Sequence, residues 1–135
     1  MGLKEKRACQ EFMTSNFPAL KAKIDAAAKM TINLEVEWEG LQDPGMDHLY
    51  AEAWPKVYFE PLVKGLTVIA GDDMGAKALA GGLKKIVVKN DDTFANPEGI
   101  TFAGGVLTIN HKPTTNMDNV SDRANKVQSL LENGL

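Results

Sequence analysis

The amino-acid sequence predicts an α+β domain in which helices cover one face of a four-stranded, mainly antiparallel sheet. Three observations lead to this prediction. Apolar and polar residues alternate over 30–39, two strand-like segments flank Gly104-Gly105, and apolar residues recur at helical spacing over 17–28 and 117–131. Because helices and clustered strands are typical of this class, we expect the order α-α-β-α-α-β-β-β-α in one domain over 1–135.

Length and composition fit a globular domain. The chain has 135 residues, of which 44% are hydrophobic and 24% charged. The net charge of -3 argues against general nucleic-acid binding, which usually needs a basic surface. The apolar stretches are shorter than the ~20 residues that a membrane-spanning helix needs, and the single cysteine, Cys9, fits a reducing compartment. We therefore expect a cytoplasmic protein that binds neither nucleic acid nor membrane.

The first third of the chain predicts two helices and a strand. Residues 3–14 mix charged and apolar side chains in a way typical of a short helix. Asn16-Phe17-Pro18 predicts the start of a second helix over 17–28, because Asn caps helices and Pro is favoured in the first turn. Over 30–39, the even-numbered apolar residues share one face of a strand and the polar residues between them share the other.

The middle of the chain is expected to be helical before a second strand begins. Residues 46–70 fit helices, although Pro55 should break or restart the helix because proline supplies no backbone donor. A further helix is expected over 73–83. The β-branched segment 85–89 then predicts a short strand, and a loop of about ten residues follows it.

Residues 100–109 predict a β-hairpin, and the C-terminal segment predicts a last helix. Gly104-Gly105 suits the positive φ angles of a two-residue turn. This turn fixes a register in which the apolar side chains share one face. They are Ile100, Phe102, Leu107 and Ile109. The same alternation places His111 on that face, at its end.

Four residues are candidates for a pocket between the sheet and the helices. They are His48, Glu52, Tyr58 and His111. His48 and Glu52 are four positions apart, so a helix would place both on one face as metal ligands or as a solvated pair. With two scattered histidines and no cysteine partner, we predict neither a metal nor a cofactor. His111 could serve as a general base beside a carboxylate, or could simply pack at the rim of the sheet.

Three acidic residues are candidates for binding a basic protein partner. Glu35, Glu37 and Glu39 occupy alternate positions, so the predicted strand places their charges in a row on one face. The alternative is that Lys85 and Lys89 neutralise them across the sheet.

Two aromatic residues are further candidates for a partner-binding surface. Trp54 belongs to the densest aromatic group, and Phe94 lies in the loop that follows strand 85–89. Large aromatics are common at interfaces. The alternative for both residues is packing in the core.

No complete catalytic motif is present. Residues 71–77 resemble a phosphate-binding loop, but the spacing is one residue short and Ala78 replaces the required hydroxyl. We therefore predict no catalytic residues and favour a non-catalytic cytosolic module that binds another protein. A further possibility is that the partner is a second copy of the chain, bound through a sheet edge to form a homodimer. The alternative function is a small-molecule-binding protein or a hydrolase that uses the four-residue pocket.

Overall fold

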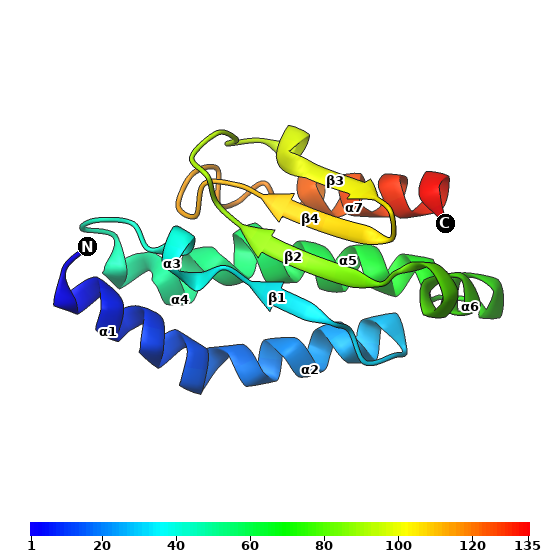
Figure 1. The fold of residues 1–135 in the computed structure, drawn as a ribbon, viewed down its shortest axis with the longest axis horizontal. Coiled ribbons are helices and arrows are strands. Elements are labelled where there is room, and N and C mark those ends of the chain that lie inside the picture. The colour runs from blue at the N-terminus through cyan, green and yellow to red at the C-terminus, as the bar shows by residue number, and fades with distance from the viewer.

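A mixed four-stranded sheet lies against a layer of helices (Figure 1). The computed structural model describes residues 1–135. The strands are β1 (Leu34–Val36), β2 (Lys85–Lys89), β3 (Ile100–Ala103) and β4 (Val106–Asn110). They lie in the order β1-β2-β4-β3. The predicted α+β class and the four strands are therefore confirmed.

The prediction of a mainly antiparallel sheet is wrong. β1 is parallel to β2, β2 is parallel to β4, and only β3 and β4 are antiparallel. Helices connect β1 to β2 and return the chain to the end at which β1 began, as a parallel pair requires. The segment 90–99 is too long for a tight hairpin and carries the chain past one strand position. β4 therefore fills the place beside β2, and β3 becomes the edge strand.

The two faces of the sheet differ in burial because strand side chains alternate between faces. On the face toward the helices, four side chains from the two central strands are fully buried. They are Ile86, Val88, Leu107 and Ile109. On the other face, Glu35 and Thr101 are exposed, and Lys85, Lys89 and Thr108 are half-buried. The sheet thus has one apolar face in the core and one mainly polar face toward solvent, although buried Val87 also lies on the second face.

The helical layer matches the predicted order, with additional short helices. Its α-helices are α1 (Leu3–Glu11), α2 (Phe17–Ala28), α3 (Trp38–Leu41), α4 (Tyr50–Trp54), α5 (Glu60–Ile69), α6 (Asp73–Gly82) and α7 (Val120–Gly134). Short 3₁₀ turns cover Asp47–Leu49 and Pro97–Gly99. The predicted helix over 17–28 is confirmed with the same bounds. None of the helices has the length and hydropathy needed to cross a bilayer.

Pro55 does not break the helix, contrary to the prediction. A π-helical turn over Pro55–Phe59 joins α4 to α5, and another over Phe12–Asn16 joins α1 to α2. A π turn widens the helix and changes its hydrogen-bonding partners without ending it. The backbone therefore stays helical from Tyr50 to Ile69.

The strand predicted over 30–39 is shorter than its sequence pattern indicates. Only Leu34–Val36 pairs with β2, and Trp38 begins α3. The Trp38 ring packs at centroid distances of 5.0 Å from Phe17 and 5.9 Å from Trp54. The amide of Glu37 still donates to the carbonyl of Val88 at 2.9 Å, and aromatic packing replaces the sheet alternation only from Trp38, beyond the end of β2.

The predicted hairpin register is confirmed at every pair. Ile100 lies opposite Ile109, and Ala103 lies opposite Val106. Gly104 and Gly105 have φ angles of 59° and 79°, in the left-handed region that glycine adopts without strain. Local turn chemistry and the apolar pattern agree here, so no distant contact is needed to set the register.

α5 and α7 approach closely where α5 has no side chain. A Cβ atom on Gly65 would lie 2.6 Å from Cγ1 of Val127, a fully buried residue of α7. Such a distance is too short for a carbon–carbon contact, and dense cores accommodate extra atoms poorly. The helix pair therefore depends on glycine at position 65.

We predict that Gly65→Ala lowers the free energy of unfolding by about 1–3 kcal/mol because the added methyl group forces α5 and α7 apart. Gly81→Ala is the matched control, since no atom lies within 4 Å of its Cβ position. That variant should be neutral or up to about 1 kcal/mol more stable, because alanine favours helix. Urea denaturation of both variants measures the difference, and equal stability would contradict the close approach.

Candidate functional site

Tyr58 and His111 meet in a buried polar cluster beyond the end of β4. The Tyr58 hydroxyl donates a hydrogen bond to the main-chain oxygen of His111, and both side chains are fully buried. Nδ1 of His111 lies 2.7 Å from the carbonyl oxygen of Lys112, so Nδ1 carries the proton and donates. Nε2 of His111 has no partner within hydrogen-bonding distance, although the main chain of Ala95 acts to raise the pKa of the ring.

The surroundings of these two side chains favour their neutral forms. Burial is the main cause that lowers the pKa of His111, and the positive charge of Arg123 lowers it further. Burial also raises the pKa of Tyr58 well above its usual value. The imidazole of His111 and the phenol of Tyr58 are therefore both neutral near neutral pH.

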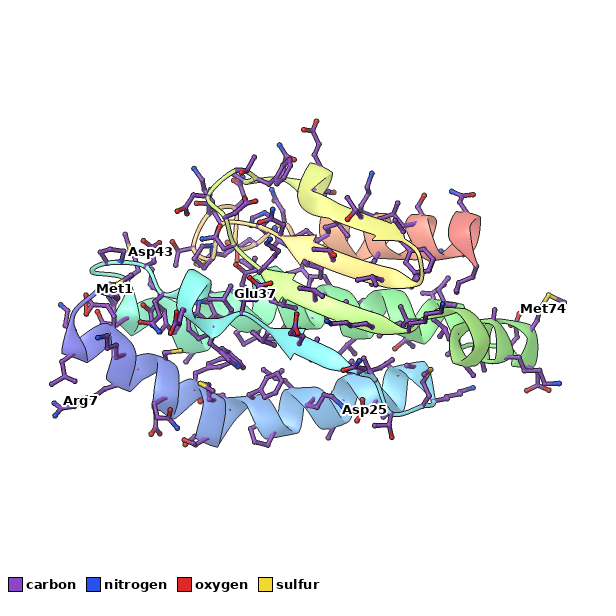
Figure 2. The ribbon with its side chains drawn as sticks, viewed as in Figure 1. Met1, Arg7, Asp25, Glu37, Asp43 and Met74 are labelled. Atoms are coloured by element: carbon purple, nitrogen blue, oxygen red, sulfur yellow. The ribbon has the colours of Figure 1, made fainter.

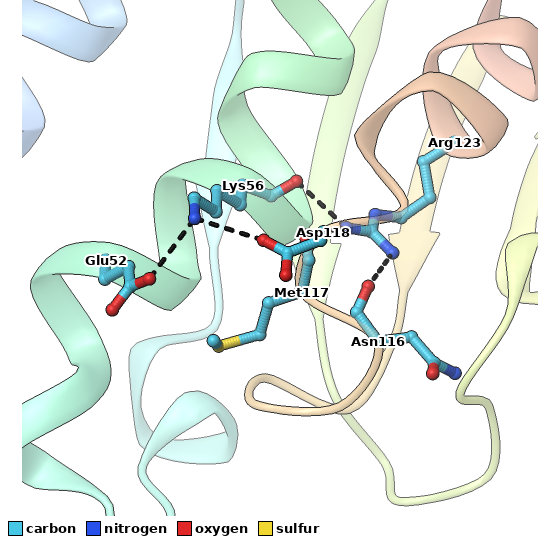
Figure 3. Close-up of polar contacts among 6 residues, drawn as sticks. All are labelled: Glu52, Lys56, Asn116, Met117, Asp118 and Arg123. Atoms are coloured by element: carbon cyan, nitrogen blue, oxygen red, sulfur yellow. Dashed lines mark hydrogen bonds and ion pairs between the residues drawn. The ribbon is translucent and has the colours of Figure 1, made fainter.

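Arg123 ties the segment between β4 and α7 to the helical layer. Its guanidinium is fully buried and donates to the carbonyl oxygens of Lys56, Asn116 and Met117, at 3.1, 2.9 and 2.8 Å (Figure 3). No carboxylate lies within ion-pair distance of it. Burial accordingly lowers the pKa of Arg123. Main-chain carbonyl dipoles, rather than an acidic side chain, compensate this buried charge.

Glu52 and His48 do not join the buried cluster. Glu52 forms an ion pair with Lys56 at 3.2 Å, and Lys56 also contacts Asp118 at 3.2 Å (Figure 3). His48 is exposed and forms no hydrogen bond or ion pair. None of the cavities in the structure is lined by any of the four predicted pocket residues. The structure therefore brings Tyr58 and His111 together and leaves Glu52 and His48 on the surface.

The predicted acidic row does not form on one strand. β1 ends at Val36, so Glu37 lies beyond the strand and Glu39 lies in α3. Glu35 alone is paired, with Lys85 at 3.2 Å. All three glutamates are exposed, and Glu37 and Glu39 form no ion pair. They stay a predicted partner-binding group, in a different arrangement from the one expected.

The two aromatic candidates lie in different surroundings. Trp54 is fully buried and stacks on Tyr50 with a ring-centroid distance of 4.2 Å. It cannot contact a partner, because core packing uses the whole side chain. Phe94 is half-buried and covers Gly99, where an added Cβ would lie 2.8 Å from Cβ of Phe94. The structure also holds no cluster of three or more acidic, histidine or cysteine side chains placed to bind a metal.

An apolar groove lies where α5 ends, α6 begins and α7 ends. Its volume is about 340 Å³. Its lining residues are Val68, Ile69, Asp72, Met74, Gly75, Ala78, Leu131, Glu132 and Leu135. Met74 is 82% exposed and Val68 is 53% exposed, and Figure 2 shows Met74 projecting from the end of the molecule. No sequence pattern predicts this groove, because its apolar residues come from three separate helices.

A second cavity of about 420 Å³ adjoins the groove. The two share Ala78 and Leu135 as lining residues. The lining also includes Lys77 of α6, Phe102 of β3 and several glycines. These glycines are Gly81, Gly82, Gly104, Gly105 and Gly134. Groove and cavity together form a continuous concave surface that reaches from the start of α6 to the hairpin turn.

Comparison with known proteins assigns no family to this chain: no family model, no curated protein and no solved structure matches it.

The buried cluster has the composition of a reactive site but no access from solvent through a cavity. The groove has access and exposed apolar side chains. The two features therefore differ in access: the first is enclosed within the fold, and the second is open to solvent.

We predict that Arg123→Met lowers the free energy of unfolding by about 1–3 kcal/mol because three part-buried hydrogen bonds to main-chain carbonyl oxygens are lost. Amide hydrogen exchange should rise over residues 112–119, which this side chain holds in place. Arg7→Met is the matched control because Arg7 is exposed, and its effect should stay within about 0.5 kcal/mol. Similar stability and exchange in both variants would show that Arg123 does not hold the segment.

We predict that His111 makes the protein less stable at acidic pH. The pKa of His111 is lowered from 6.5 on folding, so the unfolded chain binds more protons once the pH falls below about 6.5. The free energy of unfolding should therefore fall by up to about 1.4 kcal/mol per pH unit until the pH reaches the folded-state pKa. His111→Gln should remove this part of the pH dependence, and His48→Gln should not. Urea denaturation between pH 4.5 and 7.5 measures it, and parallel pH profiles of the two variants would contradict it.

Proposed function

We propose that this chain is a protein-interaction module that binds a segment of another polypeptide in the groove bordered by α5, α6 and α7. The observation that carries the proposal is the grouping of Val68, Met74 and Leu135, all exposed, around one concave surface. Single exposed apolar residues are ordinary, but a contiguous set rimmed by polar residues is typical of interaction sites. Methionine suits such a surface because its flexible side chain adapts to a partner.

The size of the concave surface favours a short segment. Volumes of about 340 and 420 Å³ accommodate a few side chains each. A peptide that inserts several apolar residues is therefore a better match than a large flat domain surface.

The alternative of a hydrolase or small-molecule site near Tyr58 and His111 has less support. The Tyr58 hydroxyl is used by a main-chain carbonyl, and Nδ1 of His111 is used by the carbonyl of Lys112. A general base must reach its substrate. No cavity leads from solvent to Nε2 of His111, the remaining free nitrogen.

We predict that Met74→Glu reduces partner recovery at least tenfold in a pull-down from the native cell extract, because a charge in the groove opposes apolar contact. Leu3→Glu is the matched control, since Leu3 is 60% exposed on α1, away from the groove. Thermal unfolding should show that both variants remain folded.

The same pull-down distinguishes the groove from the acidic residues near β1. A triple variant of Glu35, Glu37 and Glu39 to Lys changes charge without altering the groove. Loss of partners in the triple variant but not in Met74→Glu would refute the groove as the binding surface.

A further inference from the structure

The groove is bordered by two helical ridges. Met74 and Ala78 are four residues apart on α6. Leu131 and Leu135 are also four apart, where α7 ends; Leu131 is fully buried, and Leu135, which follows the helix, is exposed. The amide of Leu135 donates to the carbonyl of Leu131 at 2.9 Å, so this second pair keeps helical spacing. Side chains four residues apart form the ridges by which helices pack, and a groove between two ridges accepts the ridge of a third helix.

The rim of the groove is acidic. Asp72 and Glu132 line it, and Asp73 lies next to Asp72 at the start of α6. All three are exposed, and none belongs to an ion pair. The hydrogen bonds of Asp72 and Glu132 come from neutral donors, the amide of Gly75 and the side chain of Gln128. These carboxylates therefore have no ion-pair partner, and only the amide end of α6 offsets part of the charge on Asp72 and Asp73.

The neighbouring cavity carries partial charges of both signs, so the preference for a basic partner rests on the acidic rim of the groove. The helix does not continue to Lys84, because the amide of Lys84 donates to the carbonyl of Gly105 at 2.7 Å and not to a carbonyl of α6. α6 therefore ends at Gly82, and the negative end of its helix dipole lies beside this cavity. Lys77 is the one basic residue that lines either cavity.

Resting on the proposed function, we infer that the partner segment is an amphipathic helix whose apolar stripe is bordered by Lys or Arg. Its apolar side chains fill the space between the Met74–Ala78 and Leu131–Leu135 ridges. Its basic side chains lie over Asp72, Asp73 and Glu132. Recognition of this kind combines apolar burial, which supplies affinity, with complementary charge, which selects the partner.

A pair of synthetic helical peptides of about 18 residues tests the inference. Both carry the same leucine stripe, and the stripe is bordered by Lys in one and by Glu in the other. Fluorescence anisotropy should show the Lys-bordered peptide binding wild-type protein at least tenfold more tightly than the Glu-bordered peptide. Equal binding, or no binding of the Lys-bordered peptide, overturns the inference.

Charge variants of the protein show whether the acidic rim causes the preference. Glu132→Lys should weaken binding of the Lys-bordered peptide about fivefold, because an exposed attraction is replaced by a repulsion. Glu98→Lys is the matched control, with the same change in net charge at an exposed residue outside the groove. Equal weakening by both variants assigns the preference to net charge and overturns the inference.

Met74→Glu separates the failure of this inference from the failure of the proposed function. If Met74→Glu weakens both peptides while Glu132→Lys affects neither, the groove binds helices without regard to charge, and only the inference fails. If Met74→Glu also leaves both unchanged, the proposed function fails as well. Analytical ultracentrifugation tests whether a second copy of this chain occupies the groove. A wild-type dimer that Met74→Glu dissociates would show that it does, and would overturn the inference.

Discussion

The parallel pairing of β2 with both β1 and β4 is the constraint on which the rest of the structure depends. Parallel neighbours need long connections, because the chain must return to the same end of the sheet before each strand begins. The connection from β1 to β2 contains α3 to α6, and the apolar side chains of Ile86 and Val88 on β2 are fully buried in the core. The pairing also places the carboxyl ends of β1, β2 and β4 along the same edge of the sheet, across the strand ends. The segments 90–99 and 111–119 therefore leave the sheet close together.

That edge commonly binds ligands in parallel sheets, but here the chain's own groups occupy it. Asn110 accepts the amide hydrogen of Asp91, and the Phe94 carbonyl accepts that of Lys112. Arg123 then closes the edge from the helical side. Because the guanidinium binds main-chain carbonyls of three residues, it holds the backbone of the segment before α7 in place against the helical layer. The polar atoms at this edge are largely used in holding loops, which explains why Tyr58 and His111 meet without forming a pocket.

Sequence reasoning succeeded where structure is local. The helix over 17–28 has its capping region and apolar spacing within one segment, and the hairpin register follows from two glycines and the flanking pattern. It failed where distant segments decide the outcome. Strand direction depends on which strand lies beside β2, and the fate of Trp38 depends on rings of Phe17 and Trp54. Likewise, Trp54 fits an interface by composition, and only packing shows that it is inaccessible. The groove could not be predicted either, since α6 had first to be placed beside α7.

α7 connects the closed edge to the groove. Arg123 lies near its first turn and Leu131 near its last, about 12 Å apart along the helix axis. The contact of α7 with Gly65 of α5 holds the middle of this helix, so its last turn keeps a defined position relative to α5. A groove built from such fixed helices needs little ordering when a partner binds, and preorganisation of this kind leaves more of the contact energy for affinity. The closed edge therefore positions the helix whose far end forms one wall of the groove, and under the proposed function it would contribute to binding without touching the partner.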